Sequence, residues 1–238
     1  MTVFGAVFAR GGSKGVPGKN LRKVAGKSLL EHSIALGIAS PLIHEMICST
    51  DSREIAAEAE RLGADVPFLR PDELSTDTSP EWAAWHHLAS HLLSAGAEKE
   101  DLLVSLPTTA PLRLAEDIHN AVNLFQSSEF DVVLAVSESA RNPWFNMVTR
   151  SEDGGVALAA GSKETEVSRR QDAPSVFDIT TVVYVTTLGF VSSSSTLFDG
   201  SVGSVLIPSE RAIDIDTELD LDVADYLLTK RLESSHEQ

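Results

Sequence analysis

The stretch VFGAVFARGGSKGVPGKNLR, residues 3–22, decides the fold of this 238-residue chain. Its apolar first part, residues 3–9, is typical of a strand that a parallel sheet buries on both faces. Its second part, residues 10–22, contains no acid, and six of the chain's 19 Lys and Arg residues lie between Arg10 and Lys27. Glycines let backbone N–H groups turn toward a phosphate, and cationic side chains neutralise its charge. The sequence therefore predicts an anion-binding loop after the first strand, with a polyphosphate as its ligand.

The rest of the chain is acidic, with a formal net charge of -16, and 42% of its residues are hydrophobic. An acidic surface repels the phosphates of nucleic acids and anionic membranes, so neither is expected as a partner. The single cysteine, Cys48, lies in an apolar run and is predicted to be a core residue. No intrachain disulfide can form, residues 3–9 are too short for a signal sequence, and no run approaches the ~18 apolar residues of a membrane span. We therefore expect a cytoplasmic protein.

Strand and helix patterns alternate through the first half of the chain. After the strand at 3–9, the patterns predict helix 28–39, strand 44–49, helix 52–62, strand 66–69, helix 80–94, strand 102–106, helix 115–127 and strand 131–136. This succession predicts a doubly wound, mostly parallel α/β sheet that binds ligands at the carboxyl ends of its strands. Asp51 is predicted as the N-cap of the helix at 52–62.

The alternation breaks in the second half of the chain. A polar, Gly-containing stretch at 151–171 predicts an excursion from the sheet, in the form of a hairpin arm, and core strands follow at 181–185 and 202–207. A final amphipathic helix carries its apolar residues at Leu219, Val223, Tyr226 and Leu227. We expect one domain, residues 1–238, with an inserted arm at 140–177.

Several known signatures nearly match the basic loop. A Walker A loop ending at Lys19 would need Gly in place of Ser13 and Ser or Thr in place of Asn20, and a dinucleotide-binding G-x-G-x-x-G fails at the same Ser13. The segment GGSKG at 11–15 satisfies the G-x-S-x-G elbow of hydrolases, but an elbow turns directly into a helix, and here a proline and another glycine intervene. A solvated basic loop without a ligand is disfavoured, because so many glycines and cations in one loop contribute little to the stability of the fold.

Near the other end of the chain, the segment AIDIDTELD at 212–220 carries two carboxylates on one face. Side chains alternate in an extended segment, so Asp214 and Asp216 point to the same side. Carboxylates so close repel each other unless a cation lies beside them, and hard oxygen ligands next to a phosphate suit Mg²⁺. The alternative, that Asp216 or Thr217 only caps the last helix, leaves Asp214 unexplained.

A third segment, PTTAPLR at 107–113, follows a predicted strand and so belongs to the same edge of the sheet as the basic loop. Its hydroxyls and Arg113 are candidates for ligand contact, with a rigid turn before the next helix as the alternative. His87 and His91 have i, i+4 spacing but no Glu between them, so a zinc site is not expected.

Together, these elements resemble the cytidylyltransferases that activate nonulosonic acids, the sialic-acid-type CMP-sugar synthetases. The matching segments span nearly the whole chain and lie at residues 9–15, 19–20, 49–51, 69–71, 77–78, 111–113, 170–171 and 213–220. The first and the last of these segments are specific to the family.

The resemblance implies a Rossmann-like nucleotidyltransferase fold and roles for individual residues. The residues expected to hold the triphosphate for catalysis are Arg10, Lys14 and Lys19. The other residues expected to bind the nucleotide are Gly11, Gly12, Ser13, Asn20, Arg70 and Thr78. Those expected to contact the acidic nine-carbon sugar are Thr109, Arg170 and Gln171. The expected Mg²⁺ ligands are Asp214 and Asp216, and the arm is expected to form the contact of a homodimer.

The chain departs from enzymes that use N-acetylneuraminic acid at the positions that contact the sugar. Those enzymes have Gln-Pro-Thr-Ser-Pro-Leu-Arg where this chain begins with Pro107 and Thr108, and they have an Arg where this chain has Asp178. Two other segments, RNPWFN at 141–146 and RQDAP at 170–174, are similar to the branch that acts on legionaminic acid or a related bacterial sugar.

The resemblance therefore implies that the anomeric hydroxyl of a nonulosonic acid attacks the α-phosphate of CTP, giving a CMP-sugar and pyrophosphate. Two alternatives stay open at this point. One is a nucleotidyltransferase acting on a sugar 1-phosphate, and the other is a non-catalytic sugar-nucleotide binding protein of the same fold.

Overall fold

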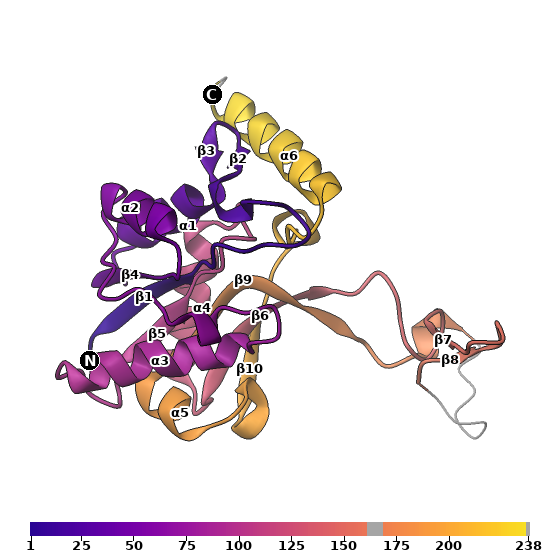
Figure 1. Cartoon of the computed structure of the whole chain (residues 1–238). Helices are drawn as coiled ribbons and strands as arrows, with labels where there is room; N and C mark the ends of the chain where they lie inside the picture. Colours follow the sequence, from indigo (N-terminus) through magenta and orange to yellow (C-terminus); the bar gives the residue numbers. More distant parts are fainter. Residues whose placement is uncertain (161–168, 237–238) are drawn as a thin grey trace.

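A six-stranded sheet forms the centre of the molecule in the computed structural model, which describes residues 1–160 and 169–236 (Figure 1). In spatial order its strands are β10 (Val202–Leu206), β6 (Val132–Glu138), β9 (Phe177–Thr187), β5 (Leu102–Ser105), β1 (Val3–Phe8) and β4 (Glu45–Ser49). β1 pairs parallel with β4 and β5, and β10 pairs parallel with β6. β9 alone is antiparallel to its neighbours β5 and β6. The predicted mostly parallel sheet is confirmed.

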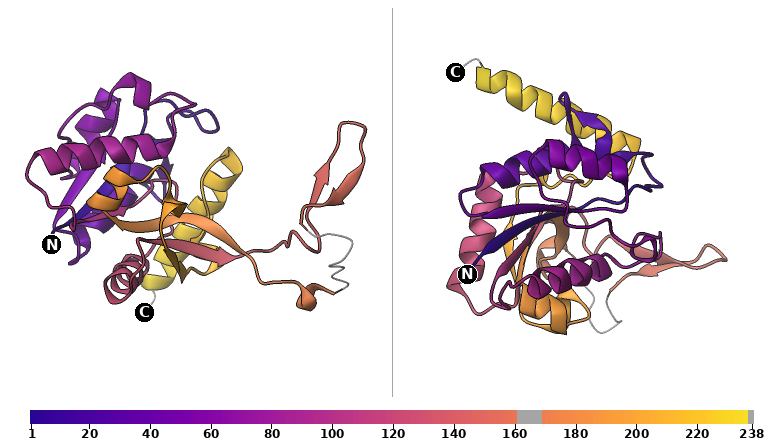
Figure 2. Two further views of the ribbon diagram at one scale, coloured as in Figure 1. Left: turned by 90° about the horizontal axis from the view of Figure 1, so that it is seen from below. Right: turned by 60° about the vertical axis from the view of Figure 1, so that its left-hand side comes forward.

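Helices cover both faces of the sheet, as Figures 1 and 2 show. The helices on one face are α1 (Leu29–Ala39), α2 (Arg53–Arg61) and α4 (Ala115–Ser127), and those on the other are α3 (Glu81–Ser94) and α5 (Leu188–Ser193). Cys48 is fully buried, as predicted, in the apolar core between the sheet and helices α1, α2 and α4, together with Val7 and Ile34. This double winding places the loops after the parallel strands at one open edge of the sheet.

Two local predictions are wrong. α2 begins at Arg53, and its N-cap is Ser52, whose hydroxyl accepts the N–H of Ile55, so Asp51 is not the cap. The expected strand at 66–69 is reduced to isolated bridges that join Asp65 to Ile47 and Leu69 to Thr50. Pro67 stands between those bridges, and a proline lacks the N–H that a regular ladder needs.

The last helix, α6 (Glu218–His236), packs beside the small ribbon of β2 (Lys23–Val24) and β3 (Lys27–Ser28) rather than on the main sheet (Figure 1). Its buried residues are Leu221, Ala224 and Leu228. The predicted apolar face is therefore wrong: Leu219, Val223 and Tyr226 are exposed, and only Leu227 is partly buried. Both sets repeat at helical spacing, so periodicity alone does not choose between them.

The core beneath α6 joins the two ends of the chain. Val16 of the basic loop and Ile215, between the two aspartates, are both fully buried in it, next to Val24 and Leu221. Apolar burial thus fixes the carboxylate segment against the loop near the amino terminus.

A long arm leaves the sheet between β6 and β9 (Figure 1). Its described part holds the hairpin of β7 (Val148–Arg150) and β8 (Val156–Leu158) and the short helix η3 (Arg170–Asp172). Residues 161–168 of the predicted excursion lie outside the described residues. At the arm's base Asn142 is buried, and its side-chain amide donates to the carbonyl of Pro174 at 2.8 Å. Among the described residues, no helix combines the length and apolarity needed to cross a bilayer.

Candidate active site

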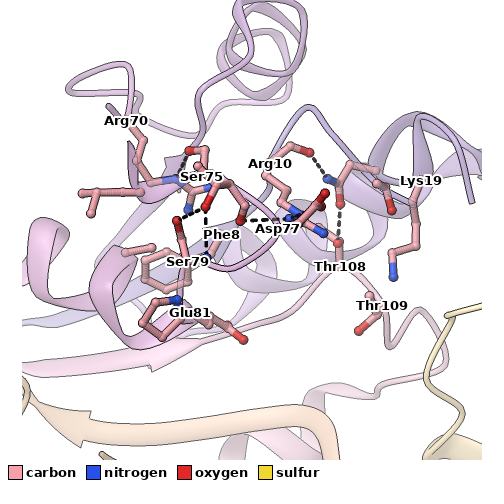
Figure 3. Close-up of a pocket in the computed structure, with 16 residues that line it drawn as sticks. Phe8, Arg10, Lys19, Arg70, Ser75, Asp77, Ser79, Glu81, Thr108 and Thr109 are labelled. Atoms are coloured by element: carbon pink, nitrogen blue, oxygen red, sulfur yellow. Dashed lines mark hydrogen bonds and ion pairs between the residues drawn. The ribbon is translucent and has the colours of Figure 1, made fainter. Parts of the chain in front are cut away.

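A cavity of about 290 Å³ lies at the edge of the sheet where β1 and β5 end (Figure 3). The next strand of the sheet after β1, β4, lies on one side of β1, and the strand that follows it, β5, lies on the other side. The cavity is therefore at the switch point where doubly wound sheets bind ligands. The cavity is lined by the basic loop after β1, the segment after β5 and the segment that leads into α3. It receives Arg10, Ser13, Lys19, Asn20, Arg70 and Thr109 from the predicted site.

The basic loop is held in place by side chains that meet its backbone. The amide of Asn20, a buried residue, donates to the carbonyl of Arg10 at 2.9 Å and its oxygen accepts the Thr108 hydroxyl at 2.6 Å. The N–H of Gly11 donates to Asp51 at 2.9 Å. Asn20 thus fastens the loop to the segment after β5, and Asp51 fastens it to the end of β4.

The loop and the carboxylate segment are in direct contact. Lys19 Nζ donates to the carbonyl of Ile215 at 2.6 Å and lies 3.1 Å from Asp216 Oδ1. A Cβ added to Gly15 would collide with the carbonyl oxygen of Asp216, so only glycine fits at this junction. Residues near the two ends of the sequence therefore meet at one site.

Two further cations of the loop, Arg10 and Lys14, share one internal counterion, Asp77. Arg10 Nη1 lies 3.0 Å from Asp77 Oδ1, and Lys14 Nζ lies 2.8 Å from Asp77 Oδ2. Arg10 also donates to the carbonyl of Thr76 at 3.2 Å. The hydrogen bond from Lys14, together with the charges of Lys14 and Arg10, lowers the pKa of the Asp77 carboxyl. The Asp77 carboxylate thus lies between Arg10 and Lys14, in a position where a phosphate group could also bind.

Arg70 is a buried cation in the cavity wall. Its Nε donates to the Ser75 hydroxyl at 2.9 Å, and its Nη2 lies 4.0 Å from Asp51. Burial lowers the pKa of Arg70, and the charge of Asp51 opposes that shift. Thr78 does not line the cavity, although its neighbours Asp77 and Ser79 do.

Among the described residues, Asp214 and Asp216 each have one carboxylate oxygen without a hydrogen-bond partner, and neither residue lines the cavity. Asp214 Oδ1 accepts the Thr181 hydroxyl at 3.1 Å, which in turn accepts from Thr109 at 3.0 Å, and Asp216 Oδ1 faces Lys19. Within the described part of the chain, no group of three or more His, Cys, Asp or Glu side chains is arranged to hold a metal. Two carboxylates fit Mg²⁺ when substrate phosphates and water supply its other oxygen ligands. His87 and His91 instead pack their rings on Phe68, at centroid distances of 4.4 and 5.0 Å.

Five further residues of the predicted site lie in the basic loop or in the arm. Gly11, Gly12 and Lys14 belong to the loop but do not line the cavity. Gln171 lies in η3 and lines a separate pocket at the arm's base, so this chain does not bring it to the cavity. Arg170 belongs to the same short helix, and its side chain lies outside the described part of the structure.

Arg113 serves the fold and not the cavity. It is buried and donates to the carbonyls of Val182, Pro107 and Thr181, the last two at 2.7 and 3.3 Å. The rigid-turn alternative therefore fits Arg113, whereas Thr108 and Thr109 of the same segment line the cavity, where they can contact a ligand.

Two acids that line the cavity, Asp77 and Glu81, have no role assigned from the sequence, although Asp77 lies in the matching segment 77–78. Asp77 lies 67 positions from its partner Arg10, and nothing in the local sequence joins them. Glu81 is the first residue of α3, where the helix dipole favours an acid. An acid at this position therefore does not by itself indicate a binding site.

An α/β sheet with a basic, glycine-rich loop at its switch point and a carboxylate, Asp216, in contact with that loop is typical of a nucleotidyltransferase-type nucleotide-binding protein. The cytidylyltransferase family model matches residues 5–181. The chain belongs to the cytidylyltransferase family.

Individual relatives agree with this assignment. The chain is 30% identical over 225 residues to post-translational flagellin modification protein B of Campylobacter coli, covering 94% of each protein. It is 30% identical over 223 residues to the CMP-N,N'-diacetyllegionaminic acid synthase of Campylobacter jejuni, covering 94% of this chain and 93% of that one. In fold it is similar to a CMP:2-keto-3-deoxy-manno-octonic acid synthetase solved with CTP, with a TM-score of 0.72 and 12% identity over 97% of this chain and 100% of the other.

Proposed function

We propose that this cytidylyltransferase transfers CMP from CTP to the anomeric hydroxyl of a nonulosonic acid of the legionaminic type, releasing pyrophosphate. The observation that carries the proposal is the contact of Lys19 with Asp216 beside the cavity, which unites a phosphate-binding loop with a carboxylate pair. The similarity to a diacetyllegionaminic acid synthase and the segments at 141–146 and 170–174 support this choice of sugar.

The chain's own groups would do the chemistry by position and charge. Arg10, Lys14 and Lys19 hold the triphosphate and stabilise charge on the departing pyrophosphate. Mg²⁺ held by Asp214 and Asp216 would neutralise charge on the transferring phosphoryl group. The transfer needs the acceptor hydroxyl in line with the leaving group and no covalent nucleophile.

A pyrophosphate-release assay with CTP and Mg²⁺ tests the proposal. The acceptors are N,N'-diacetyllegionaminic acid, pseudaminic acid, N-acetylneuraminic acid and a sugar 1-phosphate. We expect release with a keto-acid sugar, fastest with the legionaminic acid. Release with the sugar 1-phosphate alone would favour that class of transferase. No product with any acceptor, together with CTP binding that ignores Mg²⁺, would favour a non-catalytic binding protein.

We also propose that Asp77 competes with the triphosphate for Arg10 and Lys14, which gives a testable prediction. Exposed ion pairs contribute about 0–1 kcal/mol each, so Asp77→Asn should tighten the binding of inorganic triphosphate and of CTP by about 2- to 10-fold. The gain should shrink at high salt. Titration calorimetry measures both effects, and Asp72→Asn, an exposed acid of the same segment, is the matched control. Weaker binding by the Asp77 variant would show that Asp77 supports the nucleotide and does not compete with it.

The arm, residues 140–177 of a single catalytic domain, is proposed as the contact of a homodimer. Val148, Val156 and Leu158 share one face of the β7–β8 hairpin with Arg150, and all four residues are exposed. A two-stranded hairpin with a largely apolar exposed face is at best marginally stable by itself in water. A partner's arm would cover this face, and Arg170 and Gln171 would then act on the sugar from the dimer. We place this dimer in the cytoplasm, where CTP is available.

Leu158→Glu should therefore weaken the dimer by about 100-fold or more, because the new charge would be buried opposite the apolar Val148. Thr149→Glu, on the opposite face of the same hairpin, is the matched control and should leave the dimer intact. Analytical ultracentrifugation over a concentration series measures both. A monomeric wild-type protein, or equal behaviour of the two variants, would contradict the proposed contact.

A further inference from the structure

Glu81 lines the cavity, and its carboxylate uses little of its hydrogen-bonding capacity within the described part of the protein. Trp85 Nε1 donates to its Oε1 at 3.2 Å, and within the described residues Glu81 forms no ion pair. A carboxylate accepts about four hydrogen bonds. Most of this capacity is therefore open to whatever fills the cavity, as Figure 3 shows from the way the side chain points inward.

The position of Glu81 indicates which part of a nucleotide it meets. Lys19 lies at one end of the cavity, while Glu81 and Arg70 lie toward the other, with the Phe8 ring beside Glu81 (Figure 3). The protein packed around the Glu81 carboxyl raises its pKa, and the hydrogen bond from Trp85 and the charge of Arg70 oppose the shift, while the cavity leaves the residue exposed to solvent. With the triphosphate held at the lysine end, the nucleobase extends toward Arg70, Phe8 and Glu81.

An acid that faces the 4-position of the base matches cytosine and not uracil. Cytosine carries an amino donor at N4 next to acceptors, whereas the uracil-type edge carries an acceptor oxygen at that place. Arg70 can only donate and an ionised Glu81 can only accept. A carboxylate facing the oxygen of uracil would leave two acceptors opposed in a partly buried site.

We propose that Glu81 is a specificity-determining residue, which accepts a hydrogen bond from the N4 amino group of cytosine and thereby excludes UTP. The proposal rests on the proposed function only in taking CTP as the nucleotide. It is independent of which acceptor receives the CMP.

Glu81→Gln tests the proposal by binding alone. The variant keeps the size of the side chain, but its amide can turn to donate to the uracil oxygen. Titration calorimetry with CTP and with UTP, in Mg²⁺ and without any sugar, should show weaker CTP binding, stronger UTP binding and a CTP-to-UTP preference that falls about 10- to 100-fold. Glu73→Gln makes the same change on η2 (Asp72–Leu74), outside the cavity lining, and should keep the wild-type preference.

Glu81→Asp keeps the charge on a shorter side chain and should keep part of the preference, which guards against a folding defect in the first variant. An unchanged preference in Glu81→Gln would overturn the proposal, and so would an equal loss of CTP and UTP affinity, which would place Glu81 at the ribose. An altered KM for the sugar with an unaltered nucleotide preference would place it at the acceptor and would also overturn it. Because the readout is nucleotide binding, a shifted preference in a protein that accepts no sugar would support Glu81 and remove the proposed function.

Discussion

Asp216→Asn is expected to lower kcat/KM by about 10²- to 10³-fold or more, because it removes charge from the carboxylate pair that would hold the metal at the transferring phosphate. The fold should tolerate the change. The Asp216 side chain is 73% exposed and its one ion pair, with Lys19, is of the kind that contributes about 0–1 kcal/mol. The measurement is the rate of CTP-dependent pyrophosphate release, with thermal unfolding as the check on the fold.

Asp222→Asn is the matched control for this substitution. It makes the same chemical change on the exposed side of α6, away from the cavity, and should leave the rate unchanged. Near-normal pyrophosphate release by the Asp216 variant would remove the metal role of that residue.

Gly15→Ala should be nearly as damaging for a purely steric reason. The added methyl group would meet the backbone carbonyl of Asp216, which cannot move aside as a flexible side chain can. The loop and the carboxylates must then separate, and a displacement of about 1 Å at a reacting centre costs about 10²-fold in rate. Steady-state kinetics and CTP calorimetry together measure the loss.

Gly12→Ala is the comparison for this loop. An added Cβ there meets nothing within 4 Å, so the junction with Asp216 stays closed and the loss should be far smaller. Equal losses in the two alanine variants would show that the loop's flexibility matters and the junction with Asp216 does not.

The order of strands and helices could be predicted from the sequence because it depends on local signals. Apolar runs of strand length alternate with helical periodicity, and the glycine-rich basic loop follows the first strand. That Asp214 and Asp216 lie on one face stays a prediction, which rests on the alternation of side chains in an extended segment.

The remaining features depend on which distant segments meet. On α6, the set Leu219, Val223 and Tyr226 and the set Leu221, Ala224 and Leu228 have similar spacing, and only the ribbon of β2 and β3 decides which is buried. Asp77 becomes a counterion only because its segment folds over Arg10 and Lys14. Such contacts are set by tertiary packing, and single-sequence patterns do not encode them.

The most direct test is a crystal structure of the protein with CTP and Mn²⁺ in place of Mg²⁺, in which anomalous scattering locates the ion. We expect the triphosphate to lie along Arg10, Lys14 and Lys19, with the ion between its oxygens and the carboxylates of Asp214 and Asp216. A nucleotide bound elsewhere, or an ion that contacts neither aspartate, would contradict the proposed function.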